Sequence, residues 1–262
     1  MTFELLSLSI EDGLARLTFT DAARGNPIEG QFCAEFCEAA IRLSEDATVR
    51  AVLISAEGPV FSYGGDVKFF VKELDHLPLD IKRWTTTLHS GVSRLQRMDA
   101  PIVAAVHGVC AGGMSALVAG SDIVVAAEDA KFVAAYAGIG FSCDAGSSIM
   151  YTRRMGIART RRFLLMNETL SAEQALTLGL ADEVVPKEQL LGRAESIAKQ
   201  LAAGPTKAFG EIRRLLATVE DQPLETQLEL EAQALARSAG TRDAREGIQA
   251  FAERRKPLFV GA

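Results

Sequence analysis

Asp144 is the side chain in this sequence that is best suited to acid–base chemistry. It lies within Gly140-Phe-Ser-Cys-Asp-Ala-Gly146, where its neighbours are small or apolar, and a carboxylate placed in this way can accept and return a proton. Two glycine-rich turns precede it, Phe61-Ser-Tyr-Gly-Gly-Asp66 and His107-Gly-Val-Cys-Ala-Gly-Gly113. If each turn presents one backbone N–H to the same oxygen, the two form an oxyanion hole. The pattern indicates chemistry on a carbonyl compound that passes through an enolate or a tetrahedral oxyanion.

Each of these features also has a purely structural explanation that the sequence leaves open. The two turns could be tight connections between a strand and a helix. Asp144 could be the N-cap of a helix predicted over residues 145–155, since aspartate is favoured at that position. Cys143 is a weak candidate nucleophile, because no histidine is adjacent in sequence and a free thiol is mostly protonated at neutral pH.

Short apolar strands alternate with amphipathic helices along the chain. Apolar residues alternate with period two across residues 6–19, and the Glu11-Asp-Gly13 turn between them predicts a hairpin. Helices are predicted over residues 28–44, about 79–98 and from Gly113, and short buried strands at 51–55, 102–106, 123–127 and near 183–185. This alternation predicts an α/β fold with mostly parallel strands.

From about Leu190 onwards the pattern is helical throughout. We therefore expect a core domain over residues 1–200 and a C-terminal helical region over residues 201–262, which packs on the core or on a partner subunit. A length of 262 residues is enough to bury a full core.

Composition and motifs exclude several classes of function. The net charge of −6 gives no support for nucleic-acid binding. The apolar runs are too short to cross a bilayer, and the first residues lack the pattern of a signal peptide, so a cytoplasmic protein is expected. The four cysteines and three histidines show no metal-ligand spacing, and we expect neither a metal nor a redox cofactor. The P-loop, dinucleotide-binding and GxSxG patterns are also missing from the sequence.

A series of segments in a fixed order resembles the crotonase (enoyl-CoA hydratase/isomerase) superfamily across nearly the whole chain. The matching segments are Asn26-Pro-Ile28, Phe61-Ser-Tyr-Gly-Gly-Asp-Val-Lys68, His107 to Gly113, Ser121-Asp122, Leu170-Ser-Ala-Glu-Gln-Ala175, Gly179-Leu180 and Phe251-Ala-Glu-Arg-Arg-Lys-Pro-Leu-Phe259. The resemblance implies a ββα spiral with a C-terminal helical trimerisation region. It also implies an acyl-CoA thioester as substrate and a homotrimer or a dimer of trimers.

By the same resemblance, the N–H groups of Gly65 and Gly113 would hold the thioester oxygen. The segment Asp66-Val67-Lys68 would line the CoA channel. Hydratases of the superfamily use two glutamates, and an alignment through Asp122 places Ala116 and Tyr136 at those positions. Neither residue can transfer a proton as a carboxylate, so simple addition of water is not expected.

Asp144 and the Ala-Gly-Ser-Ser that follows it resemble the branch of enoyl-CoA and ring-epoxide isomerases that keep a single aspartate. An isomerase is therefore the favoured function, with Asp144 as the proton carrier and Tyr136 shaping or polarising the acyl pocket. A second reading rests on the resemblance of Asp144 and His89 to the aspartate and histidine of the superfamily's aryl-CoA dehalogenases. It implies a dehalogenase or a thioester hydrolase in which Asp144 attacks as a nucleophile and His89 activates water. His89 could instead be an ordinary helix histidine. The third reading is an inactive scaffold or RNA-binding relative, which the acidic charge disfavours.

Overall fold

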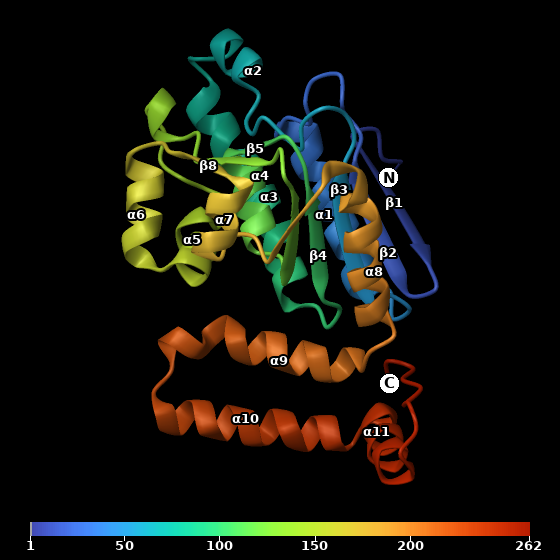
Figure 1. Cartoon of the computed structure of the whole chain (residues 1–262). Coiled ribbons are helices and arrows are strands. Elements are labelled where there is room, and N and C mark those ends of the chain that lie inside the picture. Colours follow the sequence, from blue (N-terminus) through green and yellow to red (C-terminus); the bar gives the residue numbers. More distant parts are fainter. Residues whose placement is uncertain (1) are drawn as a thin grey trace.

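The hairpin predicted at the start of the chain is confirmed. In the computed structural model, which describes residues 2–262, β1 (Leu6–Glu11) and β2 (Leu14–Phe19) pair antiparallel. The sheet then continues in parallel through β3 (Ala51–Ala56), β4 (Ile102–Val106), β6 (Ile123–Ala127) and β9 (Glu183–Val185). Its strand order is β1-β2-β3-β4-β6-β9 (Figure 1). The expected α/β fold with mostly parallel strands is therefore confirmed.

The parallel strands are apolar along their length because helices cover both faces of the sheet. In β4, alternate residues join two different hydrophobic clusters, Ile102, Ala104 and Val106 on one face and Val103 and Ala105 on the other. α1 (Gly30–Glu45) and α3 (Leu77–Arg97) pack together over the first face, and α8 (Leu190–Ala202) covers the second. α1 and α3 match the helices predicted over residues 28–44 and about 79–98 to within two residues at each end.

Short elements carry the two glycine-rich turns and the Asp144 segment. α2 (Val67–Lys72) and α4 (Gly112–Ala119) each begin in or directly after a turn. A smaller sheet contains β5 (Val109–Ala111), β7 (Lys131–Val133) and β8 (Thr169–Ser171). A 3₁₀ turn (Ala137–Ile139) leads to α5 (Ser147–Met155), followed by α6 (Ile157–Leu165) and α7 (Ala172–Leu178). Because α5 packs against the fully buried α4, the segment before α5 lies beside the start of α4.

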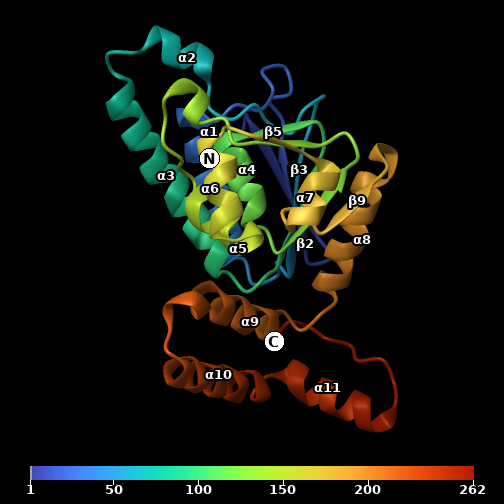
Figure 2. The ribbon, with the colours of Figure 1, turned by 60° about the vertical axis from the view of Figure 1, so that its left-hand side comes forward.

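The C-terminal helices form a layer of their own below the sheet, as Figures 1 and 2 show. They are α9 (Thr206–Thr218), α10 (Leu224–Ala239) and α11 (Arg242–Glu253). The expected domain boundary between residues 200 and 201 falls inside α8, just before this layer begins. Within residues 2–262, no helix combines the length and apolar character needed to span a membrane.

Buried and paired charges fasten α9 to the core. Arg213, which is 9% exposed, donates hydrogen bonds to Asp122 and to the backbone oxygens of Leu95 and Met98. Asp99, which directly follows Met98, accepts hydrogen bonds from Lys207 and Arg214. A buried guanidinium requires such partners, because an unpaired buried charge is strongly destabilising.

Asp243 fastens the C-terminal tail to α11. Its carboxylate is 2% exposed and accepts the backbone N–H groups of Val260 at 2.7 Å and Gly261 at 2.8 Å. We expect Asp243→Asn to lower the free energy of unfolding by about 1–3 kcal/mol, because an amide cannot accept both bonds as a charged group does. Urea unfolding measures the change. The exposed turn variant Asp12→Asn is the control, and equal stability of both variants would contradict the role given to Asp243.

Candidate active site

The two glycine-rich turns are hydrogen-bonded to each other. The backbone N–H of Ser62 donates to the Val109 oxygen, and the N–H of Ala111 donates back to the Ser62 oxygen, so Ser62 and Cys110 form a parallel bridge. Gly65 and Gly113 each lie three residues beyond their bridge residue. The sequence spacing from the bridge is therefore the same in both turns, and both glycines line the same cavity.

Glycine is required at these turns because the backbones approach closely. Gly64 has a φ of 82°, and a methyl group added to it would lie 3.0 Å from the Ala111 oxygen. Within residues 2–262, neither the Gly65 amide nor the Gly113 amide donates a hydrogen bond to a protein acceptor. Two unpaired N–H groups, one at the start of a buried helix, are suited to bind an anionic oxygen.

The Asn26 signature supports the first turn rather than contacting a substrate. Asn26 is 2% exposed, and its side-chain amide donates to the backbone oxygens of Glu57 and Phe61. Its own backbone oxygen accepts the Ser62 hydroxyl at 2.7 Å, and that hydroxyl in turn accepts the Gly64 N–H at 3.0 Å. Asn26 thereby fixes the backbone that leads into Gly65.

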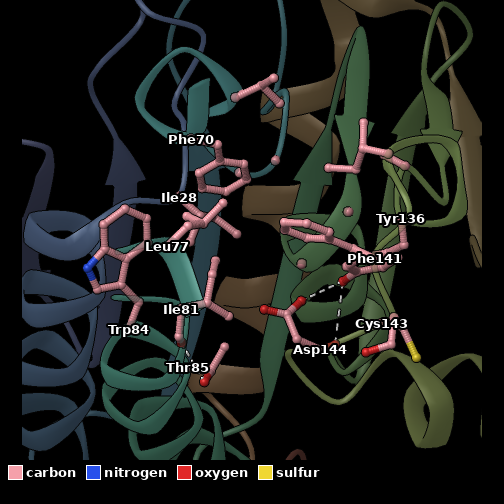
Figure 3. A pocket seen from close by; sticks show the side chains of 18 of the residues that line it. Ile28, Phe70, Leu77, Ile81, Trp84, Thr85, Tyr136, Phe141, Cys143 and Asp144 are labelled. Carbon is pink, nitrogen blue, oxygen red and sulfur yellow. Dashed lines mark hydrogen bonds between the residues drawn. The ribbon is translucent and has the colours of Figure 1, made fainter. Parts of the chain in front are cut away.

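Asp144 is half-buried and lies directly beside Gly113. A methyl group added at Gly113 would lie 3.1 Å from Asp144 Oδ1. That oxygen accepts a hydrogen bond of 2.7 Å from the Tyr136 hydroxyl, while Oδ2 accepts none within residues 2–262. Figure 3 shows the carboxylate pointing into the pocket, with one oxygen held by Tyr136. The other oxygen is available for proton transfer.

Tyr136 is 8% exposed and acts as a donor to the carboxylate. Burial, reinforced by the negative charge of Asp144, raises the pKa of Tyr136 well above its usual value, so the hydroxyl keeps its proton. The buried Ser147 completes the arrangement, because its hydroxyl lies 2.9 Å from the Tyr136 hydroxyl and donates to the Asp144 backbone oxygen at 2.7 Å.

Asp144 is not the N-cap of the following helix. α5 begins at Ser147 and its N-cap is Gly146, so no side chain caps this helix. The capping explanation offered by the sequence is therefore wrong. The Asp144 side chain instead turns toward Tyr136 and the cavity.

A cavity of about 900 Å³ opens in front of Asp144. Gly65 and Gly113 lie on its wall together with Tyr136, Asp144 and His89, so the structure brings these predicted residues into one site. Most of the remaining wall is apolar, with large side chains from α2, α3 and the loop before α5: Phe70, Leu77, Ile81, Trp84, Leu88 and Phe141. A few polar groups in a large apolar pocket are typical of small-molecule sites.

The three residues predicted to line the CoA channel, Asp66, Val67 and Lys68, differ in their position relative to the cavity. Val67 lines the cavity, whereas Asp66 and Lys68 are not among the lining residues of the described chain. Asp66 is the N-cap of α2, since its Oδ1 accepts the Phe69 N–H at 3.0 Å. Its Oδ2 lies 3.4 Å from Arg24. Lys68 is exposed on α2.

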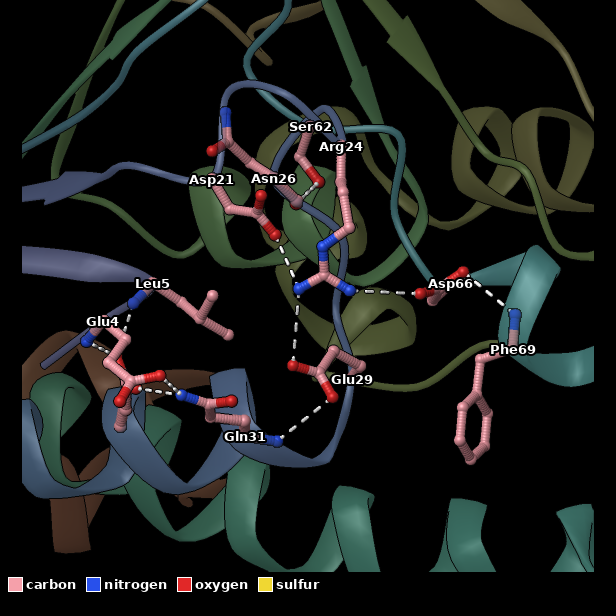
Figure 4. A network of polar contacts seen from close by, with 11 residues as sticks. Glu4, Leu5, Asp21, Arg24, Asn26, Glu29, Gln31, Ser62, Asp66 and Phe69 are labelled. Atoms are coloured by element: carbon pink, nitrogen blue, oxygen red, sulfur yellow. Dashed lines mark hydrogen bonds and ion pairs between the residues drawn. The ribbon is translucent and has the colours of Figure 1, made fainter.

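Arg24 connects the loop before α1 to the start of α2, as Figure 4 shows. Its guanidinium pairs with Asp21 at 2.6 Å, Glu29 at 3.6 Å and Asp66 at 3.4 Å. Asp66 directly follows Gly65, so this network holds the backbone on the C-terminal side of the first candidate oxyanion donor.

The cavity also contains cysteines, which are poor nucleophiles here. Cys33 is 1% exposed, and burial, reinforced by the Asp144 charge, raises its pKa to about 12. It is therefore a neutral thiol at physiological pH. Cys143 lines the cavity as well, and no histidine nitrogen is hydrogen-bonded to it within residues 2–262.

Sequence reasoning missed Arg24, Ser147 and Cys33 as residues of the site. Ser147 lies three positions after Asp144, and that spacing was the available signal, since a serine there can reach back to the loop backbone. The link from Arg24 to Asp66 and the effect of Asp144 on Cys33 offered no such signal, because each joins residues that are distant in sequence.

Tyr136→Phe is expected to lower kcat by on the order of 10-fold with little change in KM. The ring remains to shape the pocket, but Asp144 loses a hydrogen bond to a charged oxygen, an interaction of about 1.5–3 kcal/mol. Steady-state kinetics on the best substrate from a panel of acyl-CoA thioesters, the class that the sequence resemblance implies, gives both constants. An unchanged kcat would show that the Tyr136 hydroxyl does not support Asp144.

Comparisons with known proteins place this geometry among acyl-CoA enzymes. A family model described as enoyl-CoA hydratase/isomerase matches residues 9–262. The chain is 33% identical to 1,2-epoxyphenylacetyl-CoA isomerase of Escherichia coli (strain K12), over 98% of this chain and 99% of that protein. It is 31% identical to 4-chlorobenzoyl coenzyme A dehalogenase-1 of Arthrobacter sp, over 90% and 86% respectively. The crystal structure of an enoyl-CoA hydratase from Polaromonas sp. JS666 matches with a TM-score of 0.91 at 28% identity, over 97% and 99%. These relatives carry three different reaction names, so the choice of reaction must come from the residues of the site.

Proposed function

This chain belongs to the enoyl-CoA hydratase/isomerase (crotonase) family, and on that premise we propose that it is an isomerase that moves a double bond or rearranges a ring in an acyl-CoA thioester. The observation that carries the proposal is the position of a single carboxylate, Asp144, beside the unpaired amide of Gly113. Within the described residues, Asp144 is the only carboxylate that lines the cavity.

For the shift of a double bond, the proposed reaction needs one base and one oxyanion site. Asp144 Oδ2 removes a proton from a carbon made acidic by the thioester, and the electron pair moves onto the thioester oxygen. The N–H groups of Gly65 and Gly113 stabilise that enolate oxygen. The protonated Asp144 then returns the same proton to a different carbon, the enolate collapses, and the thioester is regenerated with no water added or released.

Addition of water is disfavoured by the two positions at which hydratases are expected to carry glutamates. Ala116 is fully buried in α4 and has no proton to transfer. The Tyr136 hydroxyl is engaged with Asp144 and Ser147. A hydratase needs groups that both activate water and protonate carbon, and this site offers Asp144 alone.

The acyl end of the pocket favours a flat or cyclic group. Phe70 stacks near Phe141 with ring centroids 5.7 Å apart, and Trp84 lies 6.3 Å from Phe70. Aromatic walls provide large apolar contact with planar groups at favourable ring geometries. The E. coli relative is named for an aryl-acetyl epoxide, which agrees with such a pocket.

A nucleophilic route is the second candidate, because a relative is named as a dehalogenase. In that route Asp144 attacks carbon and His89 activates water. The Nε2 atom of His89, however, accepts the Ala145 N–H at 3.0 Å. A nitrogen whose lone pair is used in this way is a poor base for water, so the geometry favours the isomerase.

We also propose that the reaction uses no cofactor or metal apart from the CoA of its substrate, because the chain supplies both the base and the oxyanion donors. A homotrimer or a dimer of trimers is proposed as the assembly. Large apolar side chains are exposed on the C-terminal helices, among them Ile212, Leu216, Leu224, Leu235 and Phe251, and exposed apolar patches of this kind mark subunit contacts.

The deciding experiment is a panel of β,γ-enoyl, dienoyl, aryl and haloaryl CoA thioesters, incubated in ¹⁸O water with the wild type and with Asp144→Asn. An isomerase gives a product of unchanged mass with a shifted double bond or ring, and no ¹⁸O in the acyl group. Labelled free acid or labelled hydroxyaryl product would instead favour the nucleophilic route. Loss of all turnover in Asp144→Asn supports the assignment of the base.

A further inference from the structure

We propose that His89 is a positioning residue, which in its neutral form holds the Asp144 loop against helix α3. The proposal rests on the proposed function, because it concerns the aim of the Asp144 carboxylate. It assigns His89 a role different from the activation of water, and one that involves no contact with the reacting atoms.

The direction of the hydrogen bond fixes the chemical state of the ring. The Ala145 backbone N–H can only donate, so His89 Nε2, at 3.0 Å, must be the acceptor and carry no proton. The neutral ring therefore carries its proton on Nδ1. A doubly protonated imidazolium has no acceptor and would lose this bond.

His89 accepts the N–H of Ala145, a residue whose backbone conformation is unfavourable and must be stabilised by its surroundings. Ala145 has a φ of 51°, a left-handed conformation that alanine rarely adopts, and Gly146 continues it with a φ of 83°. These two residues connect Asp144 to α5. A backbone held in a rare conformation persists only when its surroundings fix it, and such places are concentrated at functional sites.

The partner that supplies the bond is rigid. α3 spans 21 residues and packs along α1, and the neighbouring Leu88 is 1% exposed in the core. His89 itself lies at the boundary between the acyl cavity and an open polar groove that includes Ser93 and Arg94. The bond thus joins a strained loop to a fixed helix at the edge of the pocket.

Bonds from Tyr136, Ser147 and His89 together hold the Asp144 loop. Tyr136 holds Asp144 Oδ1 and the Ser147 hydroxyl holds the Asp144 backbone oxygen, whereas His89 holds the next backbone amide and ties the loop to α3. Loss of the His89 bond removes the tie to α3 while leaving Tyr136 and Ser147 in place, so the carboxylate can shift relative to Gly113. A displacement of about 1 Å at a reacting group can lower a rate by on the order of 100-fold.

Two variants of similar size distinguish loss of the hydrogen bond to Ala145 from a change in side-chain volume. His89→Leu has no acceptor, and we expect its kcat to fall by on the order of 10- to 100-fold with a small change in KM. His89→Gln places an amide oxygen close to where Nε2 lies, and we expect it to recover most of the lost kcat. Equal kcat for His89→Leu and wild type, or equal loss in both variants, would overturn the proposal.

An independent readout requires no turnover. In free wild-type protein labelled with ¹⁵N-histidine, two-bond ¹H–¹⁵N spectra should show the His89 ring as the Nδ1–H tautomer with an unprotonated Nε2. The His89→Gln variant assigns the signal, because the other histidines are His76 and His107. A ring with Nε2–H would overturn the proposal even if Asp144→Asn is inactive, whereas full activity of Asp144→Asn would sink the proposed function and leave the tautomer result standing.

Discussion

Asp144→Asn is expected to lower kcat by on the order of 10²- to 10⁴-fold, the range that general acid–base catalysis contributes. The asparagine side chain has the same shape, and its oxygen can still accept the Tyr136 hydroxyl bond now made by Oδ1. The variant therefore keeps the loop and the pocket, but it cannot take a proton from carbon. Substrate affinity should change little, because the oxyanion donors at Gly65 and Gly113 are unaltered.

The measurement combines turnover with equilibrium binding of a non-reacting acyl-CoA analogue. Asp75→Asn is the matched control, since it makes the same chemical change at an exposed residue between α2 and α3 that does not line the cavity. Proton exchange at the substrate carbon in ²H₂O gives a second test. If Asp144→Asn still exchanged that proton at the wild-type rate, another group would have to be the base.

The fold was predictable where local pattern and burial agree. In the parallel strands, apolar residues run without interruption because both faces are covered, and the limits of β4 and β6 were predicted to the residue. The helix α3 begins two residues earlier than expected because Pro78 is tolerated in a first helical turn. A helix starting at residue 145, directly after Asp144, was predicted. The helix begins instead at Ser147, because the backbones of Ala145 and Gly146 are left-handed.

The site was predictable only in part, since spacing identifies turns but not the bonds between them. The glycines indicated two turns, and the family resemblance indicated which amides matter. The link between Ser62 and Cys110, however, joins segments 48 residues apart and has no local signal. The same limit applies to the ion pair between Arg24 and Asp66, which joins residues 42 positions apart.

Tertiary contacts thus converted three local features into one chemical arrangement. The Gly113 amide is unpaired because it lies in the first turn of α4, and the Gly65 amide donates to no protein acceptor within residues 2–262. The carboxylate is in reach because α5 packs on α4. Burial keeps Tyr136 protonated and Cys33 neutral, and Asp144 is the only carboxylate among the described residues that line the cavity, which is why we propose it as the proton carrier.

Gly113→Ala is expected to lower kcat/KM by on the order of 100-fold, although the change adds only one methyl group. That methyl would lie 3.1 Å from Asp144 Oδ1, 3.0 Å from Ile28 Cδ1 and 3.3 Å from the Ala145 side chain. The carboxylate must move to relieve the contact, and the Gly113 amide is then less accessible to a substrate oxygen. Gly192→Ala in α8 is the control, because an added methyl there meets nothing within 4 Å.

A double variant separates the two effects of the methyl group. If the methyl acts mainly by displacing Asp144, adding Gly113→Ala to Asp144→Asn should cost little more, because the proton carrier is already lost. If it acts mainly by blocking the oxyanion site, the two losses should multiply, since independent effects add as free energies. The contact between the Gly113 position and Asp144 Oδ1 favours the first result. Wild-type kcat/KM in Gly113→Ala would contradict the close approach of these two residues on which the proposed reaction depends.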